Sequence, residues 1–277
     1  MRKFFLVLFV FCFANINSNS QQITFGGQIT VVSPNSNPIT YVPTATKFSG
    51  DYLVHTSDFT GIADGGIFTA SLWFKLSDAA QDGTLRRVCQ FSGIGGGLAG
   101  TCRITIDTVN KLTVTAENSS LTTILVIKST SSYTASSTWH HMITSIDMSD
   151  SAKQHLYIDG GNERNTSTFT VGGIIDFANG GNFGIMARGT DGAGIVTGSL
   201  SEVWFTTSYL DVSIASNLQL FRSTIGHPVN LGSIGDTPTG SQPRLYLKNS
   251  FATFQNNLGS GGNFSVTGSL EDDPSTP

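Results

Sequence analysis

Apolar and polar residues alternate along many short segments of this chain. In the clearest segment, 69–76, every second residue is apolar: Ala70, Leu72, Phe74 and Leu76. Because successive side chains of a strand point to opposite faces, this period of two predicts a half-buried β-strand with Trp73 on the other face. Segments 101–107 and 111–117 show the same pattern. Segment 121–127 is almost continuously apolar, which predicts a strand covered on both faces.

Two β-rich runs near the middle of the chain predict a hairpin. They span 139–148 and 153–158, and the polar residues 149–152 lie between them. The second run ends in Asp159-Gly160, a dipeptide typical of tight turns because glycine accepts a positive φ.

The remaining pattern predicts more strands and one short helix. Further strands are expected at 183–188, 197–206, 244–248 and 263–268, with Gly-rich turns between several of them. The helix is expected near 211–222, capped by Asp211 and carrying apolar residues at Ile214, Leu218 and Phe221. Since strands do not alternate with helices, we expect an all-β fold of two packed antiparallel sheets.

The N-terminus has the layout of a secretory signal peptide. Arg2 and Lys3 precede an apolar run, and an Asn/Ser-rich stretch follows, so we assign 1–20 to the signal. The alternative is an uncleaved N-terminal anchor. The apolar run is shorter than the about 20 apolar residues that a membrane span needs, which favours a signal peptide over an anchor. We expect a lead-in at 21–43, a two-sheet domain at 44–226, and a C-terminal extension at 227–277 packed on or trailing it.

Composition and charge suit an exported all-β protein. Only 12% of the residues are charged, and the formal net charge is −4. Without the signal the basic residues fall from 15 to 13 against 19 acidic ones, so no nucleic-acid partner is expected.

Two cysteines lie outside the signal, Cys89 and Cys102. They flank a glycine-rich loop between β-like segments. In an exported chain this arrangement predicts a disulfide across the hairpin, with a pair of free thiols as the alternative.

Five motifs occur in an order and spacing that resemble the laminin G-like domains of the concanavalin A-like lectins and glucanases. They lie at 48–52, 68–74, 139–141, 156–160 and 198–204. The resemblance covers about 44–222 and implies a two-sheet jelly roll that acts as a secreted binding or adhesion module, sometimes with calcium at its rim. The stretch from His227 to Phe264 resembles segments of tailed-phage structural proteins, which implies a virion or cell-surface component as a competing role.

Enzymes on this fold are glycoside hydrolases that need two nearby carboxylates. Their Glu-x-Asp-x-x-Glu strand motif is absent here. The chain contains only Glu117, Glu163, Glu202 and Glu271. Only Glu271 is followed two positions later by an acid, Asp273, and Thr276 stands where the motif needs its second glutamate. We therefore expect no enzyme activity.

Trp73 and Trp204 lie on strand faces opposite the regular apolar residues, with Glu202 beside Trp204. If that face is exposed, the three residues predict a platform for a sugar. If a second layer covers it, the tryptophans belong to the core.

The resemblance also implies a calcium site. Asp51 and Glu202 fall near positions where related domains place rim ligands, and Asp191 could add an oxygen. Turn formation is the alternative role of these acids. His140 and His141 are neighbours on a predicted strand and cannot chelate one ion together, so we interpret them and Trp139 as structural.

These observations favour a secreted or cell-surface recognition module without enzyme activity. Its expected partner is a glycan or a surface protein, with calcium as a candidate cofactor and no stable membrane insertion after signal cleavage. A structural component of a virion or cell-surface assembly is the alternative.

Overall fold

The structure is a computed structural model and describes residues 24–25, 29–30, 41–92 and 101–277. The predicted signal at 1–20 lies outside the described residues. The chain divides into two compact units, Met1–Tyr41 and Val42–Pro277. In the first unit, β1 (Thr24–Phe25) and β2 (Ile29–Thr30) form a two-stranded antiparallel hairpin. No helix in the described part of the chain is long and apolar enough to span a membrane.

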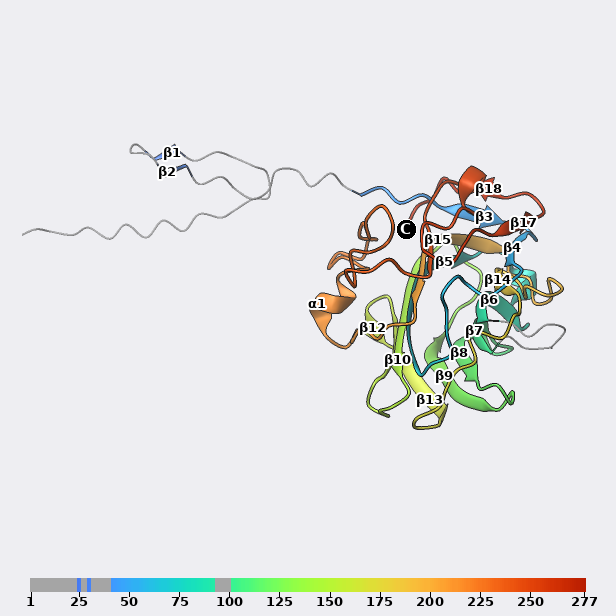
Figure 1. Ribbon diagram of the computed structural model, residues 1–277. Helices are drawn as coiled ribbons and strands as arrows, with labels where there is room; N and C mark the ends of the chain where they lie inside the picture. Colours follow the sequence, from blue (N-terminus) through green and yellow to red (C-terminus); the bar gives the residue numbers. More distant parts are fainter. Residues whose placement is uncertain (1–23, 26–28, 31–40, 93–100) are drawn as a thin grey trace, which may run out of the picture. The chain divides into compact units, whose positions relative to one another are not determined.

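The second unit is a sandwich of two antiparallel sheets with eight strands each, which confirms the all-β jelly-roll prediction (Figure 1). The first sheet has the strand order β12-β11-β10-β5-β15-β3-β18, and β16 also pairs with β15. Its strands are β3 (Thr46–Phe48), β5 (Ile67–Leu76), β10 (His140–Asp147), β11 (Gln154–Ile158), β12 (Gly161–Asn162), β15 (Gly198–Thr206), β16 (Leu245–Leu247) and β18 (Glu271–Asp272).

The second sheet has the order β13-β9-β8-β7-β6-β14-β4-β17. Its strands are β4 (Tyr52–His55), β6 (Arg86–Ser92), β7 (Cys102–Ile106), β8 (Lys111–Glu117), β9 (Thr123–Ser132), β13 (Arg164–Phe169), β14 (Phe183–Ile185) and β17 (Ser265–Thr267). Its outer face carries polar side chains; one cross-strand row there consists of Arg87, Thr105, Thr113 and Lys128.

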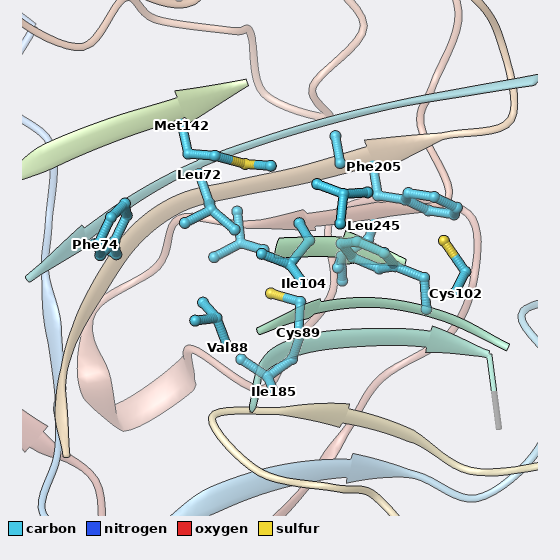
Figure 2. Close-up of a cluster of buried hydrophobic side chains, with 14 of the residues drawn as sticks. Leu72, Phe74, Val88, Cys89, Cys102, Ile104, Met142, Ile185, Phe205 and Leu245 are labelled. Carbon is cyan, nitrogen blue, oxygen red and sulfur yellow. The ribbon is translucent and has the colours of Figure 1, made fainter. Parts of the chain in front are cut away.

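The core lies between the sheets and follows the predicted alternation. Leu72 and Phe74 of β5 face Ile104 of β7 and other apolar side chains of the second sheet (Figure 2). Two short 3-10 helices, η1 (Ala79–Gln81) and η2 (Phe251–Thr253), join strands at the surface.

The predicted helix is shorter than expected. Helix α1 spans only Ala215–Leu218, and its N-cap is Ile214 without a side-chain hydrogen bond. Asp211 accepts hydrogen bonds from the backbone nitrogen and hydroxyl of Ser213, so it stabilises a turn before the helix. The prediction that Asp211 caps the helix is therefore wrong.

Residues 227–277 belong to the same compact unit as the jelly roll. They supply β16 and β18 to the first sheet and β17 to the second. The C-terminal segment therefore completes both sheets, which a strand pattern read locally does not reveal.

Cys89 and Cys102 are free thiols, so the predicted disulfide is wrong. Cys102 lies opposite Ser92 in the β6–β7 ladder, whereas Cys89 lies opposite Ile104. This register separates the cysteines by about three residues, roughly 10 Å along the strands, which exceeds the Cα separation of a disulfide, about 4.4–6.8 Å. Both thiols are buried in the core (Figure 2), and burial raises their pKa.

Candidate functional site

The three residues predicted to bind a sugar lie together but inside the protein. Ser201 pairs with Trp73, and Trp204 pairs with Ser71, which places Trp73, Glu202 and Trp204 on the adjacent strands β5 and β15. Their exposed fractions are only 3%, 2% and 0%. The prediction that they form an exposed platform is therefore wrong.

The chain after β15 covers this face of the first sheet. A second apolar cluster joins Ile143 and Trp204 of the sheet to Val212, Phe221 and Leu231 of the later chain. The Trp204 indole packs edge-on against Phe221, with ring centroids 5.1 Å apart, and donates a hydrogen bond of 2.8 Å to the Gly235 carbonyl. Because this layer comes from residues outside both strands, the alternation within 69–76 and 197–206 could not reveal it.

The structure does not bring the predicted calcium ligands together. Asp51 accepts hydrogen bonds from the backbone nitrogens of Ser49 and Ser269. Asp191 forms an ion pair with Arg188. Buried Glu202 accepts a hydrogen bond of 2.8 Å from the Tyr246 hydroxyl. The described residues contain no group of three or more His, Cys, Asp or Glu side chains suited to a metal ion, so Asp51, Asp191 and Glu202 do not fit a shared calcium site.

The histidine pair and Trp139 have separate contacts. His140 lies 2.7 Å from Asp159, whereas His141 is buried against Trp73 and lies 2.9 Å from the Ser71 hydroxyl. Burial, with a smaller effect of the Arg222 charge, lowers the pKa of His141 to about 3. Trp139 is only partly buried and donates a hydrogen bond to the Ser275 carbonyl, so it anchors the C-terminal tail rather than the core.

A cleft at one end of the sandwich is the best candidate site. The start of β5 and the ends of β10 and β15 meet there because these strands are antiparallel. The cleft has a volume of about 530 Å³. It is lined by residues of 61–67, 147–149 and 172–174, together with Thr207 and Arg244.

A second cleft of about 350 Å³ adjoins the first. The two share Asp64 and residues 172–174, and the second continues to Asn118, Thr170 and Asp176. We call the two together the rim cleft. Gly172-Gly173 is one of the Gly-rich turns that the sequence predicts, and no binding site was predicted there.

Backbone hydrogen bonds hold the floor of the rim cleft together. The Met148 nitrogen donates to the Gly66 carbonyl at 2.8 Å, and the Met148 carbonyl accepts from Gly172 at 2.6 Å. A Cβ added to Gly66 would lie 3.1 Å from the Gly173 carbonyl oxygen, and one added to Gly173 would lie 3.0 Å from Ile124. The close approach of these three segments therefore depends on glycine at both positions.

The walls of the rim cleft combine apolar and polar groups. Ile67 and Ile174 are exposed hydrophobic side chains, 39% and 55% exposed. Asp64 accepts a hydrogen bond from the Ala178 nitrogen at 2.8 Å, and the Asp147 carboxylate lies 3.0 Å from Lys153. Arg244 donates to the Thr60 carbonyl at 2.9 Å. These groups offer acceptors, donors and apolar contact to one ligand.

Two carboxylates, Asp64 and Asp176, line the far part of the rim cleft, and the charge of a third, Asp58, acts on Asp176. Burial raises the pKa of Asp176, and the negative charges of Asp64 and Asp58 raise it further. Asp58 accepts a hydrogen bond from the Gly180 nitrogen at 2.9 Å. This end of the cleft therefore has an acidic character that no sequence motif indicated.

Comparisons with solved structures show the fold. A candidate carbohydrate-binding protein from Bacteroides ovatus is similar with a TM-score of 0.53 and 15% identity, over 84% of this chain and 61% of that one. This chain thus spans about three fifths of the length of that protein. A heptameric SAP-like pentraxin from Limulus polyphemus matches with a TM-score of 0.51 and 12% identity, over 83% and 94% of the two chains.

Sequence comparisons give the family. No curated protein matches this chain. Residues 48–213 match the family described as the concanavalin A-like lectin/glucanases superfamily. The match ends before the stretch that resembles phage structural proteins, so that resemblance stays a prediction. With more than half of its residues in the match and a two-sheet antiparallel sandwich as its fold, the chain belongs to the concanavalin A-like lectin/glucanases superfamily.

Proposed function

We propose that this protein is an exported carbohydrate-recognition module that binds a glycan in the rim cleft without cleaving it. The observation that carries this proposal is the cleft itself, where exposed Ile67 and Ile174 stand beside Asp64 and Arg244. Sugars present apolar C–H faces and hydroxyl groups, and a cleft with apolar walls and a few polar groups suits both.

Family and fold support the same proposal. The chain belongs to a superfamily of lectins and glucanases, and one similar structure is a candidate carbohydrate-binding protein. No glutamate is among the described residues that line the rim cleft, and each of the four has a separate partner, which supports binding without hydrolysis by these residues. Glu117 pairs with Arg103, Glu163 accepts from Ser131, Glu202 accepts from Tyr246, and Glu271 pairs with Lys47.

A glycan array tests the proposal. We expect wild-type protein to bind a defined subset of glycans and Ile174→Ala to weaken this binding about 5- to 30-fold, the effect of losing roughly 1–2 kcal/mol of apolar contact. The matched control is Ile214→Ala, because Ile214 is 51% exposed but lies outside the cleft.

The polar side of the cleft needs its own pair of variants. We expect Asp64→Asn to weaken binding and Asp272→Asn, an exposed acid on β18, to leave it unchanged. Repeating the array with calcium and with EDTA tests the predicted calcium requirement. Silence across the array under both conditions, or binding that ignores both cleft variants, would contradict the proposal.

A further inference from the structure

Among the described residues, Arg244 is the only cationic residue that lines the rim cleft. Its Nη1 donates to the Thr60 carbonyl at 2.9 Å and to the Ser260 hydroxyl at 3.3 Å. Gly61 lies directly beside it, since a Cβ at Gly61 would be 3.0 Å from Nη1. Backbone and hydroxyl contacts thus fix one edge of the guanidinium without neutralising its charge.

The other edge of the guanidinium is available to a ligand. In the described part of the chain, Arg244 forms no ion pair with a carboxylate, and no hydrogen bond uses its Nη2 or Nε. Neither nitrogen is among the buried polar atoms without a partner, so both are accessible to solvent. Two donors in a fixed fork match the two oxygens of a carboxylate.

Charge is distributed unevenly along the rim cleft. Arg244 lines only the larger part, Asp176 lines only the smaller part, and Asp64 lines both. Asp147, the other acid of the larger part, is compensated by Lys153 at 3.0 Å. A ligand that spans both parts therefore meets the Arg244 cation in the larger part, Asp176 in the smaller part, and Asp64 where the two parts join.

A neutral sugar would use this arrangement only in part. Its hydroxyls could donate to Asp64, but the two guanidinium donors would face neutral oxygens, which form weaker hydrogen bonds than a carboxylate does. A sugar that carries one carboxylate satisfies both ends when the acid lies on Arg244 and the hydroxyls point toward Asp64.

We propose that the rim cleft selects glycans with a carboxylate-bearing sugar unit and that Arg244 binds this carboxylate, an inference that rests on the proposed function. Ile67 and Ile174 then contact the apolar face of the ring. Arg244 is thus the residue that determines specificity, whereas the apolar walls contribute affinity to any sugar.

The test compares each acidic oligosaccharide with its own methyl ester, which keeps the sugar and removes the charge. Uronate- and sialate-bearing oligosaccharides are titrated into the full-length protein by calorimetry. We expect at least one acidic oligosaccharide to bind tenfold or more tightly than its ester. Arg244→Gln should abolish this preference, and Arg244→Lys, which keeps the charge but not the fork, should retain part of it.

The matched control is Arg164→Gln. Arg164 also donates to a backbone carbonyl, that of Gln154, but it does not line the cleft. Circular dichroism confirms that each variant is folded. Equal affinity for acid and ester, or a preference that survives in Arg244→Gln, would overturn this inference. If neutral glycans bind and respond to Ile174→Ala, the inference fails while the proposed function stands; if no glycan binds, both fail.

Discussion

Glu202 is a buried acid whose position serves the architecture. It has a φ of 50° at the irregularity in the β5–β15 ladder between Ser201 and Trp204. A positive φ is unusual for a residue with a Cβ and accompanies a local bulge. The bulge points Glu202 at Tyr246 of β16, the neighbouring strand of the same sheet, and the Tyr246 hydroxyl donates to its carboxylate at 2.8 Å. The bond thus fastens β16, which comes from the later chain, to β15.

Removing this hydroxyl should reduce stability without affecting binding. We expect Tyr246→Phe to lower the free energy of unfolding by about 1–3 kcal/mol, because it leaves the buried Glu202 acceptor without this donor. Urea denaturation measures the loss, and glycan titration should give wild-type affinity because Glu202 lies outside the rim cleft. Reduced affinity in a folded Tyr246→Phe protein would show that Glu202 belongs to the binding site after all.

The C-terminal tail closes the sandwich at its edges. Strand β17 pairs with β4 of the second sheet, and β18 pairs with β3 of the first. After β18, Asp273 lies 2.6 Å from Lys75 and accepts from Ser199. Burial raises the pKa of Asp273, but hydrogen bonds from Lys75, Ser199 and Ser275 outweigh this effect and lower it to about 2.

This low pKa makes the attachment of the tail dependent on pH. Since the folded pKa lies below that of a free aspartate, ionised Asp273 stabilises the fold above about pH 4, and the contribution is lost as the pH falls toward 2. We expect Asp273→Asn to cost about 1–2 kcal/mol at pH 7, allowing for screening by solvent, and to cost little near pH 2. Urea denaturation at both pH values measures the difference.

Two comparisons sharpen this experiment. Asp272→Asn is the control, because Asp272 is the exposed neighbour of Asp273. Quenching of Trp139 fluorescence by acrylamide reports on the tail directly, because the Trp139 indole donates to Ser275. An equal loss of stability at both pH values would contradict the assigned role of the Asp273 carboxylate.

Individual elements were predictable where their own residues determine them. The period of two located β8 at 111–117 and placed β5, β10 and β15 within one or two residues of their observed bounds. Strand β17 lies within the predicted segment 263–268. Strands β13 and β18 are polar and their pairing depends on distant partners, so the local pattern did not predict them. The disulfide prediction failed for a related reason, because the register of β6 and β7 decides which residues meet.

The whole molecule determines where a ligand can bind. Both sheets bury their inner faces, and the chain after β15 covers part of the outer face of the first sheet. Alternation shows that Trp73 and Trp204 leave the central core, but it does not show whether solvent or a later segment covers them. The cleft residues Asp64, Ile174 and Arg244 come from three loops far apart in sequence, so only the folded chain brings them together.

The central claim is that a glycan binds in the rim cleft, and mapping of amide chemical shifts tests it most directly. An isotope-labelled sample is titrated with the best ligand from the array. We predict the largest shifts at the backbone amides of Gly65, Gly66, Gly172 and Gly173, which line the cleft. Shifts concentrated instead at Thr105 and Thr113, on the polar outer face of the second sheet, would contradict the account.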